Sequence, residues 1–392
     1  MIETTRIQAT EDQFTSGAYS KRPLTLVRGE GVTVWDDQGN AYLDATSGQG
    51  VALLGHAHPA IAQAITDQAR TLMTCPEIFY NDQRAQLYQA LADLLGYDLN
   101  RFFLCNSGAE AIEGALKVAR LLTGRAGVIG IRRGFHGRTL GALALTWNKK
   151  YREPFDGWLS EHVEHIPAND LDHARRAITQ QTAAVVLEVV QGEGGVYVLD
   201  ADYLRGLRAI CDETGALLII DEIQTGFGRT GRYFAFDHFA IQPDLVALGK
   251  GIAGSVPMGA VAWRGELGAI PKATHGSTFG GNPLACASAL ATINTLKTLD
   301  APQYVAQIGA WTVEEIRRRD WSAVREVRGL GLMIGLELRG RVTPVLQGLQ
   351  ARGVLALPAG LNVLRLLPPL TITQDQMLTI INAIEETLHE IE

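Results

Sequence analysis

The sequence has no long run of apolar residues. A helix that crosses a bilayer needs roughly 20 consecutive apolar residues, and no stretch of the chain approaches that length. The first residues, MIETTRIQATEDQF, are polar and acidic, and they contain no apolar core of the kind found in secretory signal peptides. The sequence therefore predicts a cytoplasmic protein with no membrane partner.

Cysteine is scarce, and there is no excess of positive charge. The four cysteines are widely separated and show no metal-ligand spacing: Cys75, Cys105, Cys211 and Cys286. This pattern is typical of unpaired thiols in a reducing compartment and predicts no metal site. The formal net charge of −7 gives no overall attraction to nucleic acid. The P-loop motif G-x-x-x-x-G-K-S/T is also missing, which disfavours a nucleotide-binding protein.

The middle of the chain alternates short apolar runs with amphipathic helical patterns. Strands are predicted at 102–104, 127–131, 183–190, 216–220, 245–248 and 259–263. Helices are predicted among them at 108–122 and 201–214. This alternation predicts an α/β fold with an open, mostly parallel sheet that is covered by helices on both faces.

The pattern changes after about residue 297. A helix at 302–319 leads into short strands around 332–338, 354–357 and 363–366. Thr373-x-x-Gln376 then has the form of a capping box that begins a final helix. A hairpin-like stretch near the N-terminus, TLVRGEGVTVWDDQGNAYLDA, suits the same small α+β unit. We expect residues 60–296 to form a large domain, and residues 1–59 and 297–392 to form a smaller one together.

Two segments place useful groups where predicted strands end, which is where ligands bind in open α/β sheets. NSGA (106–109) leads from a strand into a helix, and free N–H groups at a helix start, with Ser107 and Gly108, form a natural phosphate cradle. Asp221 ends the apolar run LLII, and a carboxylate in such a place can hold a proton on a heteroaromatic ring nitrogen.

Two further segments supply a lysine and an aromatic ring. Lys250 follows the run 245–248, and a lysine in an apolar crevice loses its proton readily and can form a Schiff base with a carbonyl. In RRGFHGRTLGA (132–142), Phe135 can stack on a planar ring and Arg138 can fork a carboxylate. Each segment alone is also compatible with an ordinary cap, loop or surface residue. Together they match what pyridoxal 5'-phosphate requires of a protein.

The chain resembles the class III aminotransferases of the ornithine and acetylornithine type, which have pyridoxal-phosphate fold type I, over nearly its whole length. Seven motifs carry the resemblance in order: NSGAEA (106–111), FHGRTLGAL (135–143), LEVVQGEGGV (187–196), DEIQTGFGRTG (221–231), ALGKGIAGSVPMGA (247–260), HGSTFGGNPLACA (275–287) and LRLLPPL (364–370). The resemblance implies a large domain with a mostly parallel seven-stranded sheet, a smaller α+β domain from both termini, and a homodimer.

The resemblance also implies a role for each site residue. The cofactor's phosphate is expected to contact Ser107, Gly108 and Ala109, with Thr278 reaching it from the second subunit. The ring is expected between Phe135 and Ile223, with Asp221 at its nitrogen, Gln224 near its 3′-oxygen and the catalytic Lys250 at its aldehyde. The substrate-binding residues are expected to be Arg138, Glu193, Ser277 and Arg365.

Arg138 is expected to bind the distal carboxylate of the substrate and Arg365 the α-carboxylate of glutamate. Glu193 is expected to act as a switch that pairs with Arg365 when the substrate is uncharged there and swings away for glutamate. Pairing is physically sensible because a buried arginine without a partner costs several kcal/mol, on the order of 3–5.

The implied activity moves the terminal amino group of an N-blocked diamino acid to and from 2-oxoglutarate and glutamate, in lysine or arginine biosynthesis. The blocking group is either acetyl, as in N-acetylornithine, or a small acidic amino-group carrier protein. SGAYSKRPLTLVRGEG, TWNKKYREPF and REVRGLGLMIGLEL are similar to the carrier-protein branch, whereas SGQGVALLGH (47–56) at the substrate entrance leaves the acyl group open. Clusters at 21–22, 132–133 and 149–152 can supply a positive rim for a carrier. The alternatives are an acetylornithine-only or ornithine-type aminotransferase and, more remotely, a glutamate-1-semialdehyde-type aminomutase.

Overall fold

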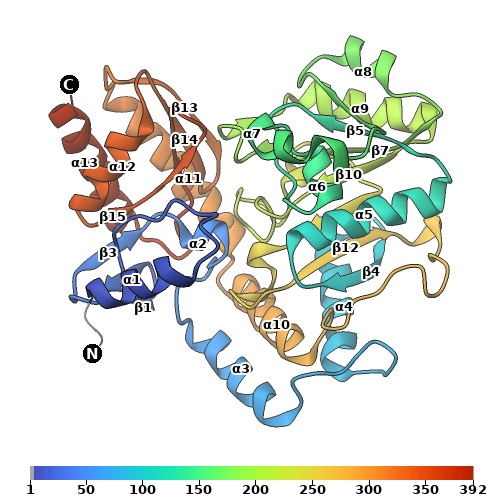
Figure 1. The fold of residues 1–392 in the computed structure, drawn as a ribbon, viewed down its shortest axis with the longest axis horizontal. Coiled ribbons are helices and arrows are strands. Elements are labelled where there is room, and N and C mark those ends of the chain that lie inside the picture. The colour runs from blue at the N-terminus through green and yellow to red at the C-terminus, as the bar shows by residue number, and fades with distance from the viewer. Residues whose placement is uncertain (1–3, 392) are drawn as a thin grey trace.

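The computed structural model describes residues 4–391 and shows two lobes side by side (Figure 1). The larger lobe is built on a seven-stranded sheet. From edge to edge its strands are β4 (Leu99–Cys105), β12 (Gly259–Arg264), β11 (Leu245–Leu248), β10 (Leu217–Asp221), β7 (Thr182–Leu187), β5 (Gly127–Ile131) and β6 (Val163–Ile166). β12 runs antiparallel to both of its neighbours, and the other pairings are parallel. The predicted α/β fold with a mostly parallel seven-stranded sheet is confirmed.

Helices cover both faces of this sheet (Figure 1). They are α4 (Asp82–Leu95), α5 (Gly108–Thr123), α6 (Leu140–Leu145), α8 (Leu171–Ala177), α9 (Ala201–Thr214) and α10 (Pro283–Thr298), whereas α3 (Pro59–Thr71) packs against α10. Successive residues of a strand point to opposite faces. In β10, Leu217 and Ile219 therefore pack into the core beneath α5 and α6, whereas Leu218 and Ile220 pack into the core that α4, α9 and α10 share. Burial on both faces explains why the central strands are continuous apolar runs.

The smaller lobe combines both ends of the chain. Its first sheet has the order β1 (Leu26–Glu30), β2 (Thr33–Asp36), β3 (Ala41–Asp44) and β15 (Val354–Leu355). Its second sheet has the order β13 (Val324–Leu330), β14 (Met333–Leu338), β17 (Val363–Leu366) and β16 (Leu357–Ala359). The helices of this lobe are α11 (Ala301–Arg318), α12 (Val342–Ala351) and α13 (Gln374–Ile391). The parallel pairing of β3 with β15 joins the two ends of the chain, while the domain limits at residues 59/60 and 296/297 stay a prediction.

The capping box before α13 is present as predicted. The backbone N–H of Gln376 donates to Thr373 Oγ1 at 3.2 Å, and the N–H of Thr373 donates to Gln376 Oε1 at 2.9 Å. These reciprocal bonds satisfy donors that the start of a helix leaves unpaired.

Two predicted strands are shorter than expected. The strand predicted at 183–190 ends at Leu187, and a separate hairpin of β8 (Val190–Gln191) and β9 (Tyr197–Val198) follows. The strand predicted at 354–357 divides at Ala356, because β15 pairs with β3 in one sheet whereas β16 pairs with β17 in the other.

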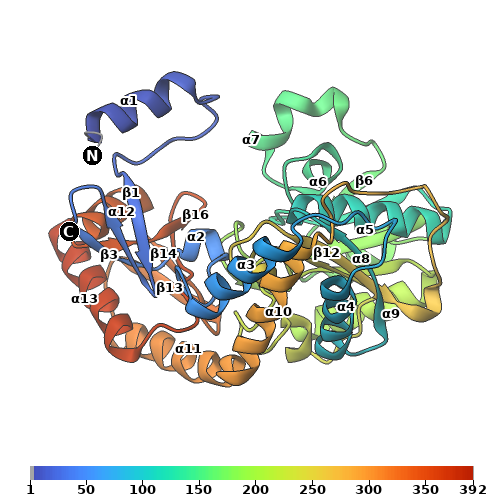
Figure 2. The same ribbon diagram turned by 90° about the horizontal axis from the view of Figure 1, so that it is seen from below.

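The remaining elements complete the described chain. They are α1 (Thr4–Phe14), α2 (Ser47–Gly50), α7 (Lys149–Arg152) and single 3-10 turns at Glu153–Trp158, Ala235–His238, Lys250–Ala253 and Gly265–Leu267. α1 stands off from the small-lobe sheet (Figure 2), held by a hydrogen bond from Gln8 to Thr25 and by ion pairs from Lys21 to Glu11 and Asp12. Within residues 4–391, the longest helices are too polar to cross a membrane.

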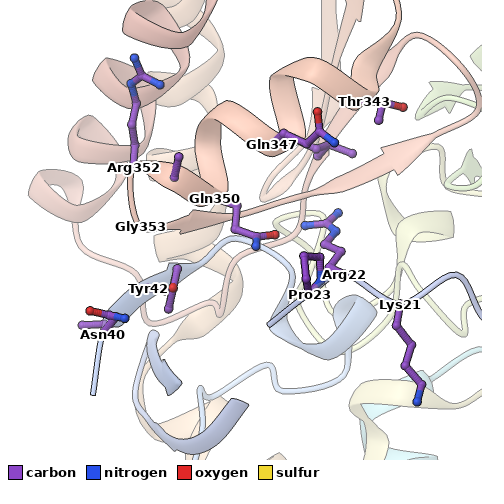
Figure 3. A pocket seen from close by; sticks show the side chains of 13 residues that line it. Lys21, Arg22, Pro23, Asn40, Tyr42, Thr343, Gln347, Gln350, Arg352 and Gly353 are labelled. Atoms are coloured by element: carbon purple, nitrogen blue, oxygen red, sulfur yellow. The ribbon is translucent and has the colours of Figure 1, made fainter. Parts of the chain in front are cut away.

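A cavity of about 820 Å³ lies in the smaller lobe between α12, β3 and residues 21–23 (Figure 3). Lys21 and Arg352 point away from it toward carboxylates, since Lys21 pairs with Glu11 and Asp12 and Arg352 pairs with Glu386 and Glu390. The lining residues include none of the predicted site residues. The predicted site residues lie instead around the carboxyl ends of the central strands β10 and β11 of the large sheet.

Candidate active site

Lys250 lies directly beyond the end of β11. Gly249 precedes it, and a Cβ at that position would lie 3.0 Å from the Cα of Gly108 and 3.2 Å from Ile223. Glycine therefore lets the end of β11 approach the start of α5. Burial lowers the pKa of the Lys250 amine; the charge of Asp221 opposes this shift, and Arg365 adds to it. A lysine with a lowered pKa is available as a neutral, reactive amine.

Asp221 is the last residue of β10, which neighbours β11 in the sheet. Its Oδ1 accepts the backbone N–H of Ile223 at 3.0 Å, and its Oδ2 lies 2.7 Å from Nδ1 of His136. Burial alone would lower the pKa of His136, but its hydrogen bond with Asp221 and the nearby carboxylate charges outweigh burial and raise that pKa. The carboxylate is thus fixed in orientation from two sides.

The predicted phosphate cradle is the start of α5. Ser107 is the N-cap, and its Oγ accepts the N–H of Glu110 at 3.2 Å. Gly108 packs so closely that an added Cβ would lie 2.8 Å from Ile223. The first N–H groups of a helix have no acceptor within the helix, so the N–H groups here are suited to a phosphate.

Arg365 and Glu193, predicted as a pair, are in contact. Arg365 lies on β17 and is 2% exposed; its Nη2 donates to Glu193 Oε1 at 2.6 Å. Its Nη1 donates to Gln224 Oε1 at 3.1 Å, and within the described chain its buried Nε has no hydrogen-bond partner. Gln224, expected at the 3′-oxygen of the cofactor, is thus also a neighbour of Arg365. Its role toward the cofactor stays a prediction.

The other predicted residues lie nearer the surface. Arg138 is exposed, and its guanidinium lies 4.1 Å from the ring centroid of Tyr151. Phe135 makes an edge contact with the same ring at 6.1 Å. Ser277 Oγ accepts from Asn106 Nδ2 at 3.1 Å, which places it beside the cradle, and Thr278 is exposed. Contact of Thr278 with a second subunit stays a prediction.

The loop expected at the substrate entrance borders Lys250. Four consecutive residues, 47–50, have left-handed φ angles between 42° and 83°. A Cβ on Gly50 would lie 3.7 Å from Gln224 and 4.0 Å from the Lys250 side chain. Glycine adopts this region readily, but Ser47 and Gln49 are strained there, and such strain is typical of functional sites.

The side chains present fit pyridoxal phosphate. The start of α5 offers N–H groups that suit its phosphate. Asp221 offers a fixed carboxylate that suits its ring nitrogen, and Lys250 offers an amine of lowered pKa that suits its aldehyde. Gly108 and Gly249 let the start of α5 and the end of β11 lie close together, because a Cβ on these residues would lie 2.8 and 3.2 Å from Ile223.

Comparison with known proteins agrees with this geometry. The family model described as "Aminotransferase class-III" matches residues 15–388. The chain belongs to the class-III aminotransferases. It is 45% identical over 98% of its length to a LysW-aminoadipate semialdehyde transaminase of Deinococcus radiodurans, of which 90% is covered. It is 43% identical to an acetylornithine aminotransferase of Methanopyrus kandleri, with 93% and 94% of the two chains covered. An ornithine aminotransferase structure from Toxoplasma gondii has a TM-score of 0.95 at 33% identity, with 100% and 95% covered.

This class-III aminotransferase is therefore a pyridoxal-phosphate enzyme, and the predictions of family, fold, enzyme class and cofactor are confirmed.

The sequence did not predict two residues that contact the site, His136 and Glu188. Glu188 is 4% exposed, and burial raises its pKa to about 7 against the opposing charge of His136. Both residues belong to motifs that were recognised, FHGRTLGAL and LEVVQGEGGV. The available signal for Glu188 was a single acid inside the apolar run predicted as the strand 183–190.

Proposed function

We propose that this enzyme transfers the terminal amino group of an N-blocked diamino acid to 2-oxoglutarate, and that glutamate is the second substrate of the cycle. The similar proteins named above act, by their names, on LysW-aminoadipate semialdehyde and on acetylornithine. Both substrates carry a blocked α-nitrogen, and this shared chemistry supports the proposal.

The contact between Glu193 and Arg365 is the observation that carries it. A blocked diamino acid presents no charge to Arg365, whereas glutamate presents its α-carboxylate there. The Glu193 side chain is 34% exposed, so it can turn toward solvent when a substrate carboxylate replaces it, while Arg365 stays buried. An aminomutase has no glutamate half-reaction and no need for such an exchange, which disfavours that alternative.

Each side chain has a proposed task. Pyridoxal phosphate, when bound, supplies the aldehyde that accepts the amino group and a ring that withdraws electrons from the substrate carbon. The N–H groups of Gly108 and Ala109 bind its phosphate, and Asp221 holds a proton at its ring nitrogen. Lys250 moves a proton at the substrate carbon, and Arg138 binds the distal carboxylate.

We further propose that the blocking group is an acidic carrier protein. An enzyme with a net charge of −7 repels such a partner unless its rim is positive. Arg132 and Arg152 lie 5.4 and 5.6 Å from the ring centroid of Trp147, and Arg133 lies 4.5 Å from that of Tyr197. Across residues 4–391, no carboxylate forms an ion pair with any of these three arginines, and the neighbouring Lys149 and Lys150 are exposed. The lysine at position 21, by contrast, is already neutralised by two acids. The proposed rim is therefore residues 132–152.

We also propose a homodimer. Several large apolar side chains are exposed around one loop and beside Thr278: Leu72, Met73, Ile78, Phe79, Tyr80 and Phe279. Exposed apolar surface of this kind marks association sites. Burying it against a second copy would bring Thr278 to the cofactor of that copy.

A side-by-side assay tests the substrate proposal. The carrier-linked substrate is expected to have a clearly higher kcat/KM than N-acetylornithine, with a preference that shrinks as salt rises through physiological strength, where the Debye length is about 8 Å. Reversing the charge of Lys149 and Lys150 to Glu should raise only the KM for the carrier-linked substrate. A control that reverses Arg176 and Lys297, both exposed and outside the rim, changes net charge equally and should leave both substrates unaffected. A better rate with acetylornithine at every salt concentration would assign the enzyme to arginine synthesis instead.

A further inference from the structure

Glu188 occupies a central position between two segments of the active site. It follows the last residue of β7, in the middle of the large sheet, and is 4% exposed. Its Oε1 accepts the backbone N–H of Phe135 at 2.8 Å, and its Oε2 accepts the backbone N–H of Gly192 at 3.1 Å. Each oxygen of one carboxylate thus binds a different loop.

The two loops carry different parts of the site. The first holds Phe135, which is predicted to stack on the cofactor ring, and His136, which contacts Asp221. The second is the β8–β9 hairpin, in which Gly192 directly precedes Glu193, the partner of Arg365. The bonds of Glu188 therefore fix the distance between the ring-binding loop and the hairpin.

The hairpin needs such anchoring. Val196 has a φ of 58°, and a β-branched residue in the left-handed region is strained. Gln191 Nε2 donates to the carbonyl of Arg132 at 2.8 Å, and Arg328 Nε donates to the carbonyl of Gly195 at 2.9 Å. These bonds hold Gln191 just before the hairpin turn and Gly195 within it, and Glu188 holds Gly192, the residue before Glu193.

We propose that Glu188 is a positioning residue that sets the balance of the two half-reactions through Gly192 and strengthens cofactor retention through Phe135. The inference rests on the proposed function. A carboxylate is required because it offers two acceptors, whereas a glutamine offers one oxygen and would turn its NH₂ group toward the other backbone N–H. The bond to Gly192 is the longer one, so a glutamine should keep Phe135 and release Gly192.

Glu188→Gln tests this, with Glu222→Gln as the matched control. Glu222 is also a fully buried carboxylate at a strand end, but it accepts from the Thr225 hydroxyl and from the N–H of Phe236, outside both loops. Single-turnover rates of both half-reactions and the rate of cofactor release from the holoenzyme into a scavenger are measured for each variant.

In Glu188→Gln, the ratio of the terminal-amine rate to the glutamate rate should fall by about fivefold or more, the effect of one lost hydrogen bond, while cofactor release changes less than about twofold. Glu188→Ala loses both bonds and should also release cofactor about fivefold faster. The control should change neither quantity. Equal slowing of both half-reactions with unchanged cofactor release in both Glu188 variants would overturn the proposal. If the wild-type enzyme turns over neither substrate, the proposed function is refuted. The rate of cofactor release is measured without substrate, so it still tests the link between Glu188 and Phe135.

Discussion

Replacing Glu193 by alanine leaves the Arg365 guanidinium without its carboxylate. Arg365 is buried, its Nε is already unpartnered within the described chain, and only Gln224 would remain to accept from it. A blocked diamino acid brings no charge to this place, so its half-reaction would proceed with an unpaired buried cation. Glutamate supplies a carboxylate of its own and no longer has to displace Glu193.

The size of the effect follows from the burial of the pair. Removing one partner of a buried, hydrogen-bonded charge pair costs about 2–5 kcal/mol. Glu193 is 34% exposed, and solvent screening places the cost at the lower end, about 2 kcal/mol. This corresponds to about a 30-fold loss in the terminal-amine half-reaction. The glutamate half-reaction should be unchanged or faster, so the ratio of the two rates should shift by about 30-fold or more.

Single-turnover absorbance changes of the bound cofactor measure the two half-reactions separately. Glu193→Gln is the matched variant, because it keeps a hydrogen-bond acceptor for Arg365 and removes only the charge; its ratio should lie between those of the wild type and Glu193→Ala. If both half-reactions lose the same factor in Glu193→Ala, the residue only supports the hairpin and the exchange at Arg365 does not occur.

Two further outcomes are expected. Lys250→Ala should still bind pyridoxal phosphate through the start of α5, measured by equilibrium titration, but should turn over no substrate; near-wild-type turnover would remove Lys250 from the mechanism. Glu222→Gln should flatten the pH dependence of stability, measured by guanidinium unfolding between about pH 5 and 9. Burial raises the pKa of Glu222 from 4.5 to about 8, so the folded state binds this proton more tightly than the unfolded state. The stability that this proton contributes is fully present below about pH 4.5 and is lost as the pH rises through about 8. It is at most about 5 kcal/mol, since one pKa unit corresponds to about 1.36 kcal/mol. A wild-type-like pH slope in this variant would mean that Glu222 does not titrate in this range.

The residues that end the apolar strands were predictable because topology alone brings them together. β10 and β11 are parallel neighbours, and Asp221 pairs in register with Ala247, three positions before Lys250. Parallel strands end at the same edge of a sheet, so a carboxylate after one run and a lysine after the next must lie close together. The same reasoning holds for Ser107, which follows β4 and begins α5.

His136 and Glu188 were not predictable in the same way. In the sequence, one is a histidine in a basic loop and the other an acid inside an apolar run, and neither pattern says which backbone or side-chain groups lie opposite. Glu188 also explains why the predicted strand 183–190 was too long. Its carboxylate turns to two backbone N–H groups of other segments, and the sheet pairing of β7 ends one residue earlier.

The distribution of charge across the site separates the holding of the cofactor from the recognition of substrates. The predicted phosphate residues, Ser107, Gly108 and Ala109, are all uncharged. The acid nearest to them, Glu110, turns back to accept the N–H of Asn106 at 2.7 Å. If these residues bind the phosphate as predicted, its affinity rests on the N–H groups and the positive end of α5, which act without a cationic side chain. Lys250 and Arg365 are then left for groups that change during the reaction. Glu193 forms an ion pair with Arg365, whereas Asp221 contacts His136 and influences the lowered pKa of Lys250 through its charge. Because Arg365 is paired with Glu193, a substrate carboxylate that binds Arg365 must displace that acid. Glu193 is partly exposed on a strained hairpin, whereas Asp221 is held from two sides, and this difference supports the proposal that Glu193 is the acid that moves.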